Sequence, residues 1–344
     1  MNKRISVAIA TYNGEKYIEE QLTSIIKQTV PPDEIIISDD GSNDCTLEVI
    51  ENICQSYSNM SISILTDNPR HGIGGNFEWA ITHTTGDIIF ICGQDDIWSS
   101  TKVEKVIDVF RDFPNAKVVC HDFSMIDANS SPIQFDADYL FKKISLNDGE
   151  VCHISQNEYL ESAISGVLIP GFSICISKDL AKKCMPIPMN SMEDKWLAFC
   201  GLVENEVYYI NEILTLYRIH DSTIHSVDTS LVRRIKKNLS RIAKKNNESY
   251  DVLKFSDAAI AYLKRSGSTT EISDATRNVF YVRKVGAEII DAVSSSRIIG
   301  SYKLIKLYCT SKRYRKSGGK DFLIQLMNIL MYSKKTRLLQ LKRM

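Results

Sequence analysis

The sequence predicts an α/β protein in which helices flank a mostly parallel, Rossmann-like sheet. Runs made almost entirely of apolar residues, such as 35–37 and 88–92, have the length and composition of buried strands. Between them lie segments of about ten to fifteen residues with apolar side chains at helical spacing, as in 17–26. Strands that alternate with such helices form parallel sheets with crossover connections, so we expect this architecture.

Four strand–helix repeats are expected in the first 115 residues. The expected strands are 5–10, 34–38, 61–66 and 87–92, and the expected helices are 15–28, 44–57, 74–84 and 101–112. Further along we expect strands at 117–121, 206–210 and 213–219, a loop and strand within 165–176, and a helix at 192–203. The polar stretch 127–157 has no clear period, and the chain after residue 230 is basic with helical patterning.

The net charge of zero hides a large difference between two parts of the chain. Residues 1–230 contain 16 Lys and Arg against 34 Asp and Glu, whereas residues 231–344 contain 26 against 8. Such an asymmetry favours different partners for the two parts, or contact with a membrane surface. No nucleic-acid-reading motif accompanies the basic residues, so we expect no nucleic-acid partner.

The nine cysteines are scattered, and several, such as Cys92 and Cys175, lie inside apolar runs. Their odd number and the lack of a Cys-x-x-Cys motif predict reduced core residues of a cytosolic protein. The first residues lead into a strand without the apolar region and cleavage site of a signal peptide. No stretch of about 18 uncharged apolar residues occurs, so we expect no transmembrane helix.

Polar motifs follow three predicted strands, at the ends where parallel sheets bind ligands. They are Thr11-Tyr12-Asn13-Gly14, Asp39-Asp40 and Gln94-Asp95-Asp96. Carboxylates beside a bound diphosphate are typical ligands of Mg2+, and a carboxylate can also accept the ring N–H of a pyrimidine. Each motif alone also fits a turn or a helix cap. Their convergence on one sheet edge favours a site for a metal and a nucleotide.

Other candidates lie outside these motifs. The glycine-rich segment 68–76 can bring backbone N–H groups or Arg70 to a diphosphate, or it can be a flexible turn. Glu193-Asp194 opens a predicted helix, where a carboxylate is either a general base or simply favoured by the helix dipole. Arg218 and His220 follow a strand, where His220 can ligate a cation or have a structural role.

In order and spacing, these motifs resemble glycosyltransferase family 2, which has the GT-A fold. The residues that carry the resemblance are Thr11-Tyr12-Asn13-Gly14, Asp39 to Asp44, Gln94-Asp95-Asp96, Glu193-Asp194 and Tyr217-Arg218-x-His220. The element Gln94-Asp95-Asp96-x-Trp98 and the Arg-x-His ending are most similar to bacterial rhamnosyltransferase-like members that build surface polysaccharide. The resemblance covers residues 3–225.

The resemblance implies an inverting transfer from a nucleotide-activated sugar, with Mg2+ or Mn2+ as cofactor. Thr11, Tyr12 and Asn13 would surround the nucleotide, Asp39 would contact the base, and Asp95 would lie by the ribose or phosphate. Asp96 and His220 would hold the metal, Arg218 would lie near the diphosphate, and Asp194 would be the general base. Glu15, Asp40, Arg70, Asn76 and Gln94 are also expected among the nucleotide-sugar-binding residues.

We expect a catalytic domain at 1–228, which contains the residues that carry the resemblance, and a helical appendage at 229–344, which the basic charge and the helical spacing of apolar residues predict. Residues 1–115 would form the nucleotide-binding half of the domain, and 116–228 the acceptor half. The expected donor is of the dTDP-rhamnose or UDP-hexose type, and the expected acceptor is a hydroxyl of a growing, lipid-linked surface polysaccharide such as O-antigen or capsule. The appendage would lie at the inner face of the cell membrane or pack on the acidic domain.

Two competing functions differ in class from a transferase. A non-catalytic member of the family would bind a nucleotide sugar or scaffold a polysaccharide assembly complex, and the presence of both Asp96 and Asp194 argues against it. An oxidoreductase is disfavoured because no Gly-x-Gly-x-x-Gly follows the first strand.

Overall fold

The computed structural model describes residues 3–69, 71–133, 146–155, 169–188 and 191–220, together with 255, 258–259, 261–263 and 265. The chain divides into two compact units, one formed by residues 1–227 with 261–269 and the other by 228–260 with 270–344. Every helix and strand named below belongs to the first unit. Among the described residues, no helix combines the length and the apolar character that crossing a bilayer requires.

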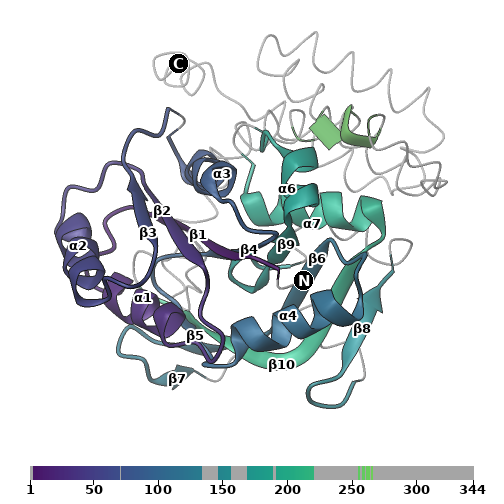
Figure 1. Cartoon of the computed structure of the whole chain (residues 1–344), viewed down its shortest axis with the longest axis horizontal. Coiled ribbons are helices and arrows are strands. Elements are labelled where there is room, and N and C mark those ends of the chain that lie inside the picture. Colours follow the sequence, from purple (N-terminus) through teal and green to yellow (C-terminus); the bar gives the residue numbers. More distant parts are fainter. Residues whose placement is uncertain are drawn as a thin grey trace, which may run out of the picture. The chain divides into compact units, whose positions relative to one another are not determined.

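A ten-stranded mixed sheet forms the centre of the first unit (Figure 1). Its strands are β1 (Ile5–Thr11), β2 (Glu34–Asp39), β3 (Ile62–Leu65), β4 (Ile88–Cys92), β5 (Ile97–Trp98), β6 (Val118–Ile126), β7 (Pro132–Ile133), β8 (Val151–Ile154), β9 (Cys175–Ser177) and β10 (Val207–Arg218). The order is β3-β2-β1-β4-β9-β6-β10-β5, while β7 pairs with β6 and β8 with β10. Since β9 is antiparallel to both β4 and β6, the six strands β1, β2, β3, β4, β6 and β10 run in one direction.

Helices flank the sheet on both sides (Figure 1). They are α1 (Ile18–Ile26), α2 (Thr46–Ser56), α3 (Ile73–His83), α4 (Lys102–Asp112), α6 (Lys178–Cys184) and α7 (Glu193–Glu204), with a short 3-10 turn, η2 (Gly171–Ser173). The apolar stripe of α1, with Ile18, Leu22 and Ile25 one helical turn apart, is fully buried. It joins α2, α4 and one face of the strands in a single apolar core, and α3 packs on the other face of β1 and β2.

The predicted fold class is confirmed, because the four strand–helix repeats of the first 115 residues are all present. The second half differs from expectation in its details. The two strands expected at 206–219 form one strand, β10, whose pairing with β6 shifts register between Ile210 and Thr215. The elements β5, β7, β8 and α6 were not predicted, since each is too short for its period to be recognised. The eight described cysteines are all free and five of them are buried, whereas Cys45 is exposed.

This topology brings several chain segments to one edge of the sheet. The carboxyl ends of β1, β2, β4 and β10 are Thr11, Asp39, Cys92 and Arg218, and all of these strands run in the same direction. Because β9 is antiparallel to β4, the turn η2 just before β9 lies beyond the carboxyl end of β4, where the Ile91 N–H donates to the Ile174 carbonyl at 3.2 Å.

Candidate active site

Asp39, at the end of β2, organises the loop that follows it. One carboxylate oxygen accepts hydrogen bonds from the Thr11 hydroxyl at 2.9 Å and the Ser42 hydroxyl at 2.5 Å. The other accepts from the backbone N–H groups of Gly41 at 3.0 Å and Ser42 at 2.7 Å. The side chain is 1% exposed. Asp39 therefore uses both oxygens to shape the loop, and its contact with a base stays a prediction.

The loop after β1 is joined to the loop after β2 by reciprocal contacts. Asn13, with φ of 48°, donates its N–H to the Ser42 hydroxyl, and its side-chain oxygen accepts from the Asn43 N–H, both at 2.9 Å. The carboxylate of Glu15 accepts from the Cys45 N–H at 2.8 Å. Asn is one of the few residues that adopts this left-handed conformation readily, which suits it to the position. The two predicted motifs thus form one connected surface.

Gln94 connects this surface to β4. Its side-chain amide accepts from the Tyr12 N–H at 2.8 Å and donates to the Tyr12 carbonyl at 3.0 Å, so it pairs with the Tyr12 backbone as a strand would. A β-carbon at Gly14 would lie 2.3 Å from the Gln94 side-chain oxygen, so a larger residue there would displace the Gln94 amide. The Tyr12 side chain remains 54% exposed. An exposed ring on a fixed backbone is a surface on which a base can stack.

Asp95 and His220 form a pair at the edge of the sheet. The Asp95 carboxylate lies 2.8 Å from His220 Nε2, and the two side chains are 21% and 12% exposed. The imidazole also packs against Tyr17, at 4.7 Å between ring centroids. Two segments that are 125 residues apart in sequence are therefore joined by side chains that remain partly accessible.

Asp96 has a different environment from Asp95. It is 2% exposed, and its carboxylate accepts the Arg218 backbone N–H at 3.1 Å. Burial, with a smaller effect from the neighbouring Asp95 charge, raises the pKa of Asp96 well above its ordinary value. We predicted Asp96 and His220 as the metal-binding pair, but it is Asp95 that contacts His220.

Arg218 is a buried connector. Its guanidinium donates to the Asp95 carbonyl at 2.7 Å, to the Ser130 hydroxyl at 2.9 Å and to the Glu20 carboxylate at 2.5 Å. It also lies over the Tyr17 ring, at 4.8 Å from the centroid. The residue is 1% exposed. Through these contacts Arg218 holds the Asp95 backbone in place, and its expected position near the diphosphate stays a prediction.

The donor atoms at this edge fit a divalent cation only in part. Asp95 offers carboxylate oxygen and His220 offers imidazole nitrogen, a combination that suits Mn2+ and, through its oxygens, Mg2+. Among the described residues, no group of three or more His, Cys, Asp and Glu side chains is arranged to hold a metal ion. A cation here would therefore need ligands from a bound diphosphate and water, which is how Mg2+ usually binds with nucleotides.

Asp40 and Asn76 fix the start of α3. The Asp40 carboxylate accepts the Gly72 N–H at 2.8 Å and lies 2.7 Å from His71 Nδ1. Asn76 is buried and donates to the Thr11 carbonyl at 3.0 Å, while its side-chain oxygen has no hydrogen-bond partner within the described part of the chain. Both residues thus lie at the predicted edge. Arg70, the remaining candidate of this segment, lies outside the described residues.

Glu193 and Asp194 are the first two residues of α7, and both are about 95% buried. Burial, with the Asp194 charge as the second cause, raises the pKa of Glu193 to about 8. One Glu193 oxygen has no hydrogen-bond partner among the residues that the structure describes. A β-carbon at Gly171 would lie 2.8 Å from the other Glu193 oxygen and 3.4 Å from the Asp194 Cβ. The turn η2 therefore packs directly on the acidic start of α7.

The start of α3 also contacts the segment that leads into α7. A β-carbon at Gly74 would lie 2.5 Å from the Ser191 carbonyl oxygen, and the Ile187 N–H donates to the Glu78 carboxylate at 2.7 Å. Since Asp40 holds the residue before α3, the end of β2 and the start of α7 are connected through α3. The structure thus brings Asp194 to the edge that carries the other candidates.

Sequence reasoning missed Lys102, which is the first residue of α4 and is 1% exposed. Its ammonium donates to the Phe172 carbonyl at 2.8 Å and to the Thr215 hydroxyl at 3.0 Å. Burial lowers the pKa of Lys102 to about 8. One signal was available in the sequence, because a cation is disfavoured in the first turn of a helix.

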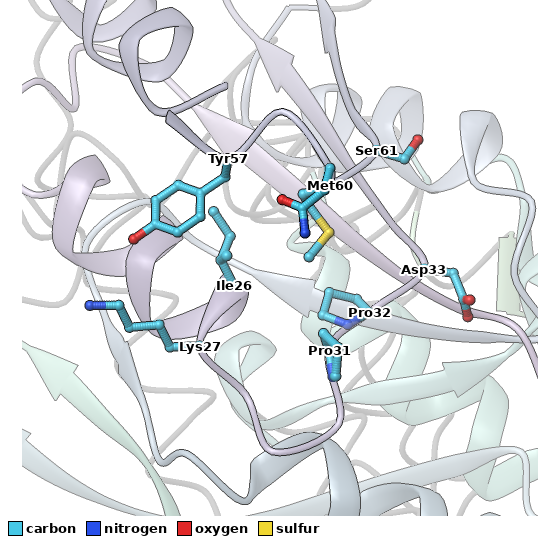
Figure 2. Close-up of a pocket in the computed structure, with 9 residues that line it drawn as sticks. Ile26, Lys27, Pro31, Pro32, Asp33, Tyr57, Met60 and Ser61 are labelled. Atoms are coloured by element: carbon cyan, nitrogen blue, oxygen red, sulfur yellow. The ribbon is translucent and has the colours of Figure 1, made fainter. Parts of the chain in front are cut away.

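A cavity lies beside the residues that directly precede β2 and β3 (Figure 2). Its volume is about 510 Å3, and it is lined by residues at the end of α1, before β2, and between α2 and β3, namely Ile26, Lys27, Pro31, Pro32, Asp33, Tyr57, Asn59, Met60 and Ser61. None of the predicted site residues lines it, so it is separate from the candidate active site.

Comparison with known proteins identifies the amino-terminal part of the chain. Residues 6–154 match the family model described as glycosyl transferase family 2. The dTDP-rhamnosyl transferase RfbG of Shigella flexneri is 36% identical over 146 residues, which cover 39% of this chain and 50% of that protein. The UDP-Glc:alpha-D-GlcNAc-diphosphoundecaprenol beta-1,3-glucosyltransferase WfgD of Escherichia coli is 27% identical over 227 residues, which cover 64% and 79%.

A solved structure extends the likeness in fold. The mannosyltransferase PcManGT from Pyrobaculum calidifontis, in complex with GDP-Man and Mn2+, superposes with a TM-score of 0.51 at 14% identity, covering 96% of this chain and 86% of that one. For several curated relatives, the chain spans only 50% to 66% of the relative's own length. The motifs, the GT-A-like α/β fold and the family match agree: residues 6–154 match the model of glycosyl transferase family 2, and the fold is that of GT-A glycosyltransferases.

Proposed function

We propose that this protein is an inverting glycosyltransferase that moves a sugar from a nucleoside-diphosphate donor to an acceptor hydroxyl. The observation that carries the proposal is the arrangement of acidic residues at one sheet edge. The Asp95–His220 pair lies at the end of β4, and Glu193 and Asp194 pack against the turn η2 beyond that same end. Glycosyl transfer can use one acidic group beside the sugar donor and a second one, acting as general base, beside the acceptor hydroxyl.

The donor side would use the surface formed by the loops after β1 and β2. The exposed Tyr12 ring is available to stack on the base, and Asn13 and Asp39 keep the loop in shape. Asp95 and His220 would hold Mg2+ or Mn2+, which when bound offsets the charge that develops on the leaving diphosphate. Arg218 would act indirectly, since it fixes the Asp95 backbone.

The acceptor side would use Asp194 as general base. Its carboxylate takes the proton of the acceptor hydroxyl while the acceptor oxygen forms a bond to the anomeric carbon. The bond between that carbon and the diphosphate oxygen breaks, and the diphosphate leaves with the electron pair. Attack from the face opposite the leaving group inverts the configuration. Asp194 lies in the first turn of α7.

The substrates are proposed from the relatives. One of them is named as a dTDP-rhamnosyl transferase, and another is named for UDP-glucose and a diphosphoundecaprenol-linked acceptor. We therefore favour a dTDP-rhamnose or UDP-hexose donor and a hydroxyl of a lipid-linked surface polysaccharide. This acceptor would place the protein at the inner face of the cell membrane.

The test combines donor binding with transfer. The full chain is screened by thermal shift against UDP-glucose, dTDP-rhamnose and GDP-mannose, with Mn2+ or with EDTA, because a ligand stabilises the fold that it binds. The donor that shifts the melting temperature is then assayed for transfer to a lipid-linked acceptor. We expect the shift to need the cation and Asp194→Asn to lose transfer by about 100-fold or more while it still binds the donor.

Asp112→Asn, at an exposed position, is the matched control and should transfer like the wild type. If no nucleotide sugar shifts the melting temperature, the donor site is refuted. If donor binds but Asp194→Asn transfers at the wild-type rate, the base assignment is refuted. If the wild type binds donor with no transfer or donor hydrolysis, a non-catalytic role replaces the proposal.

A further inference from the structure

Lys102 occupies a position that is costly for a lysine. It is the first residue of α4, where the helix dipole disfavours a cation, and it is 1% exposed, where burial disfavours any charge. Among the described charged residues, only Arg218 is a comparably buried cation. Because both the helix dipole and burial disfavour a cation at this position, Lys102 is a candidate for a role in function.

Three groups from three elements surround the Lys102 ammonium. The Phe172 carbonyl of η2 accepts at 2.8 Å, the Thr215 hydroxyl of β10 accepts at 3.0 Å, and the Trp98 ring of β5 lies 3.9 Å from the nitrogen. An ammonium has three N–H donors, so this site uses two in hydrogen bonds and turns the charge toward an aromatic face. The contacts join η2 to β5, which begins directly after Asp96, and to β10, which ends at Arg218.

The turn η2 packs against the acidic first residues of α7. Gly171 lies so close to Glu193 that an added β-carbon would be 2.8 Å from its carboxylate oxygen, and 3.4 Å from the Asp194 Cβ. On its other side, the Phe172 ring stacks on Tyr217, with 4.4 Å between centroids, directly before Arg218. The turn therefore touches both halves of the proposed reaction centre, and Lys102 holds its middle residue.

We propose that Lys102 is a positioning residue of the transfer reaction, which fixes η2 and thereby sets Asp194 relative to the Asp95–His220 pair. The inference rests on the proposed function for its catalytic meaning, but the structural link from Lys102 to η2 can be tested without substrate. Lys102 touches neither donor nor acceptor in this scheme. It acts through Phe172 and Gly171.

The substrate-free test is hydrogen exchange on the full chain. Lys102→Met keeps the length of the side chain and removes its donors. We expect the amides of Ser173 and Ile174, which close η2 by bonding to Pro170 and Gly171 carbonyls, to exchange about tenfold faster or more, because the turn opens locally. Lys105→Met on the same helix, where the lysine is 44% exposed and pairs with Glu212, is the matched control and should leave these amides unchanged.

The catalytic test compares turnover with donor binding. A misplacement of about 1 Å in a reaction centre can cost on the order of 100-fold in rate, so we expect Lys102→Met to lower kcat by about 10- to 100-fold while the donor Kd changes by less than about threefold. Gly171→Ala pushes on Glu193 from the same turn. Since both changes act through η2, their effects on kcat should be non-additive in a double-mutant cycle.

Each result supports or overturns the proposal. Faster exchange at η2, a selective fall in kcat and a non-additive cycle support it. Unchanged exchange, a kcat within about twofold of wild type, or equal losses of kcat and donor affinity overturn it. If Lys102→Met does not fold, Thr215→Val removes one of the two acceptors and is judged by the same criteria. A wild type without transferase activity refutes the proposed function, and the exchange result then still decides the link between Lys102 and η2.

Discussion

Several charged side chains at the ligand edge are satisfied by the protein itself. Asp39 accepts four hydrogen bonds from its own loop and from Thr11, and the Arg218 guanidinium is directed to Glu20, Ser130 and the Asp95 carbonyl. Groups that are already paired need little rearrangement when a ligand arrives, so the site is largely preorganised. In the proposed function these residues would act on a ligand by fixing their neighbours, whereas the exposed Tyr12 ring would contact it directly.

Glu193 gives a pH-dependent prediction at the residue scale. Burial raises its pKa from 4.5 to about 8, so the folded protein keeps a proton that the unfolded chain loses. The contribution of Glu193 to the free energy of unfolding is therefore fully present at a pH below its pKa in the unfolded chain. It decreases as the pH rises toward its pKa in the folded protein. Between about pH 5 and pH 8.5 we expect wild-type protein to lose on the order of 1–3 kcal/mol of unfolding free energy relative to Glu193→Gln.

Urea unfolding at a series of pH values measures this difference. Glu51→Gln, an exposed change on α2, serves as the control and should leave the pH dependence of the wild type intact. Parallel stability curves for wild type and Glu193→Gln would show that Glu193 does not titrate in this range.

At the scale of elements, α7 lies unusually close to the sheet. A β-carbon at Gly201 would be 2.4 Å from a Val118 methyl on β6 and 3.1 Å from a Val207 methyl on β10. Alanine normally favours a helix over glycine by about 1 kcal/mol. Because the added methyl overpacks this contact, we expect Gly201→Ala to destabilise the protein by about 1–3 kcal/mol instead.

Equilibrium unfolding in urea is the measurement, and Val118→Ala provides the internal control. If the clash with Val118 causes the loss, the double variant should be more stable than the sum of the two single changes predicts. A Gly201→Ala protein that gains stability would mean that α7 moves away from the sheet at little cost.

The elements also show what the sequence could predict. The four strand–helix repeats were predictable because each has an apolar run or stripe long enough to display its period. The acidic motifs at the strand ends were predictable because parallel strands bring their carboxyl ends to one edge. The four short elements β5, β7, β8 and α6 were not, since two to seven residues do not display a period.

The division of roles within the site could not be predicted for a related reason. Asp95 and Asp96 are neighbours in sequence, yet one contacts His220 and the other is buried beneath the Arg218 backbone. Which carboxylate turns outward depends on β10, more than 120 residues later. Lys102 was missed for the same reason, because its partners Phe172 and Thr215 come from distant segments.

At the scale of the whole molecule, the separation of charge is the main feature that the site does not explain. The acidic excess lies in residues 1–230 and the basic excess in 231–344, most of which lies outside the described residues. Our expectations of a helical basic region and of a domain boundary at residue 228 therefore stay predictions. A basic segment would attract anionic lipids, and an acidic domain would not.

We expect the full chain to sediment with vesicles that contain anionic lipid and not with neutral vesicles. Binding should fall as salt rises from about 0.05 M to about 0.5 M, because exposed charges are screened within a Debye length. Co-sedimentation with the two kinds of vesicle is the measurement. Equal recovery with neutral and anionic vesicles, or none with either at low salt, would contradict a membrane surface as the partner of the basic region.

One last consequence follows from the irregular pairing of β10. Between Ile210 and Arg218 this strand advances eight residues while its partner β6 advances five, from His121 to Ile126, so three residues of β10 are taken up in the bulged part. Side chains alternate between the two faces of a strand, and a bulge resets which residue faces which way. The number of residues in the bulge thus determines on which face of the sheet each later side chain of β10 lies. Deleting one residue there, such as Glu212, would turn Arg218 to the opposite face, so a change in chain length far from the chemistry would be enough to separate Arg218 from Asp95.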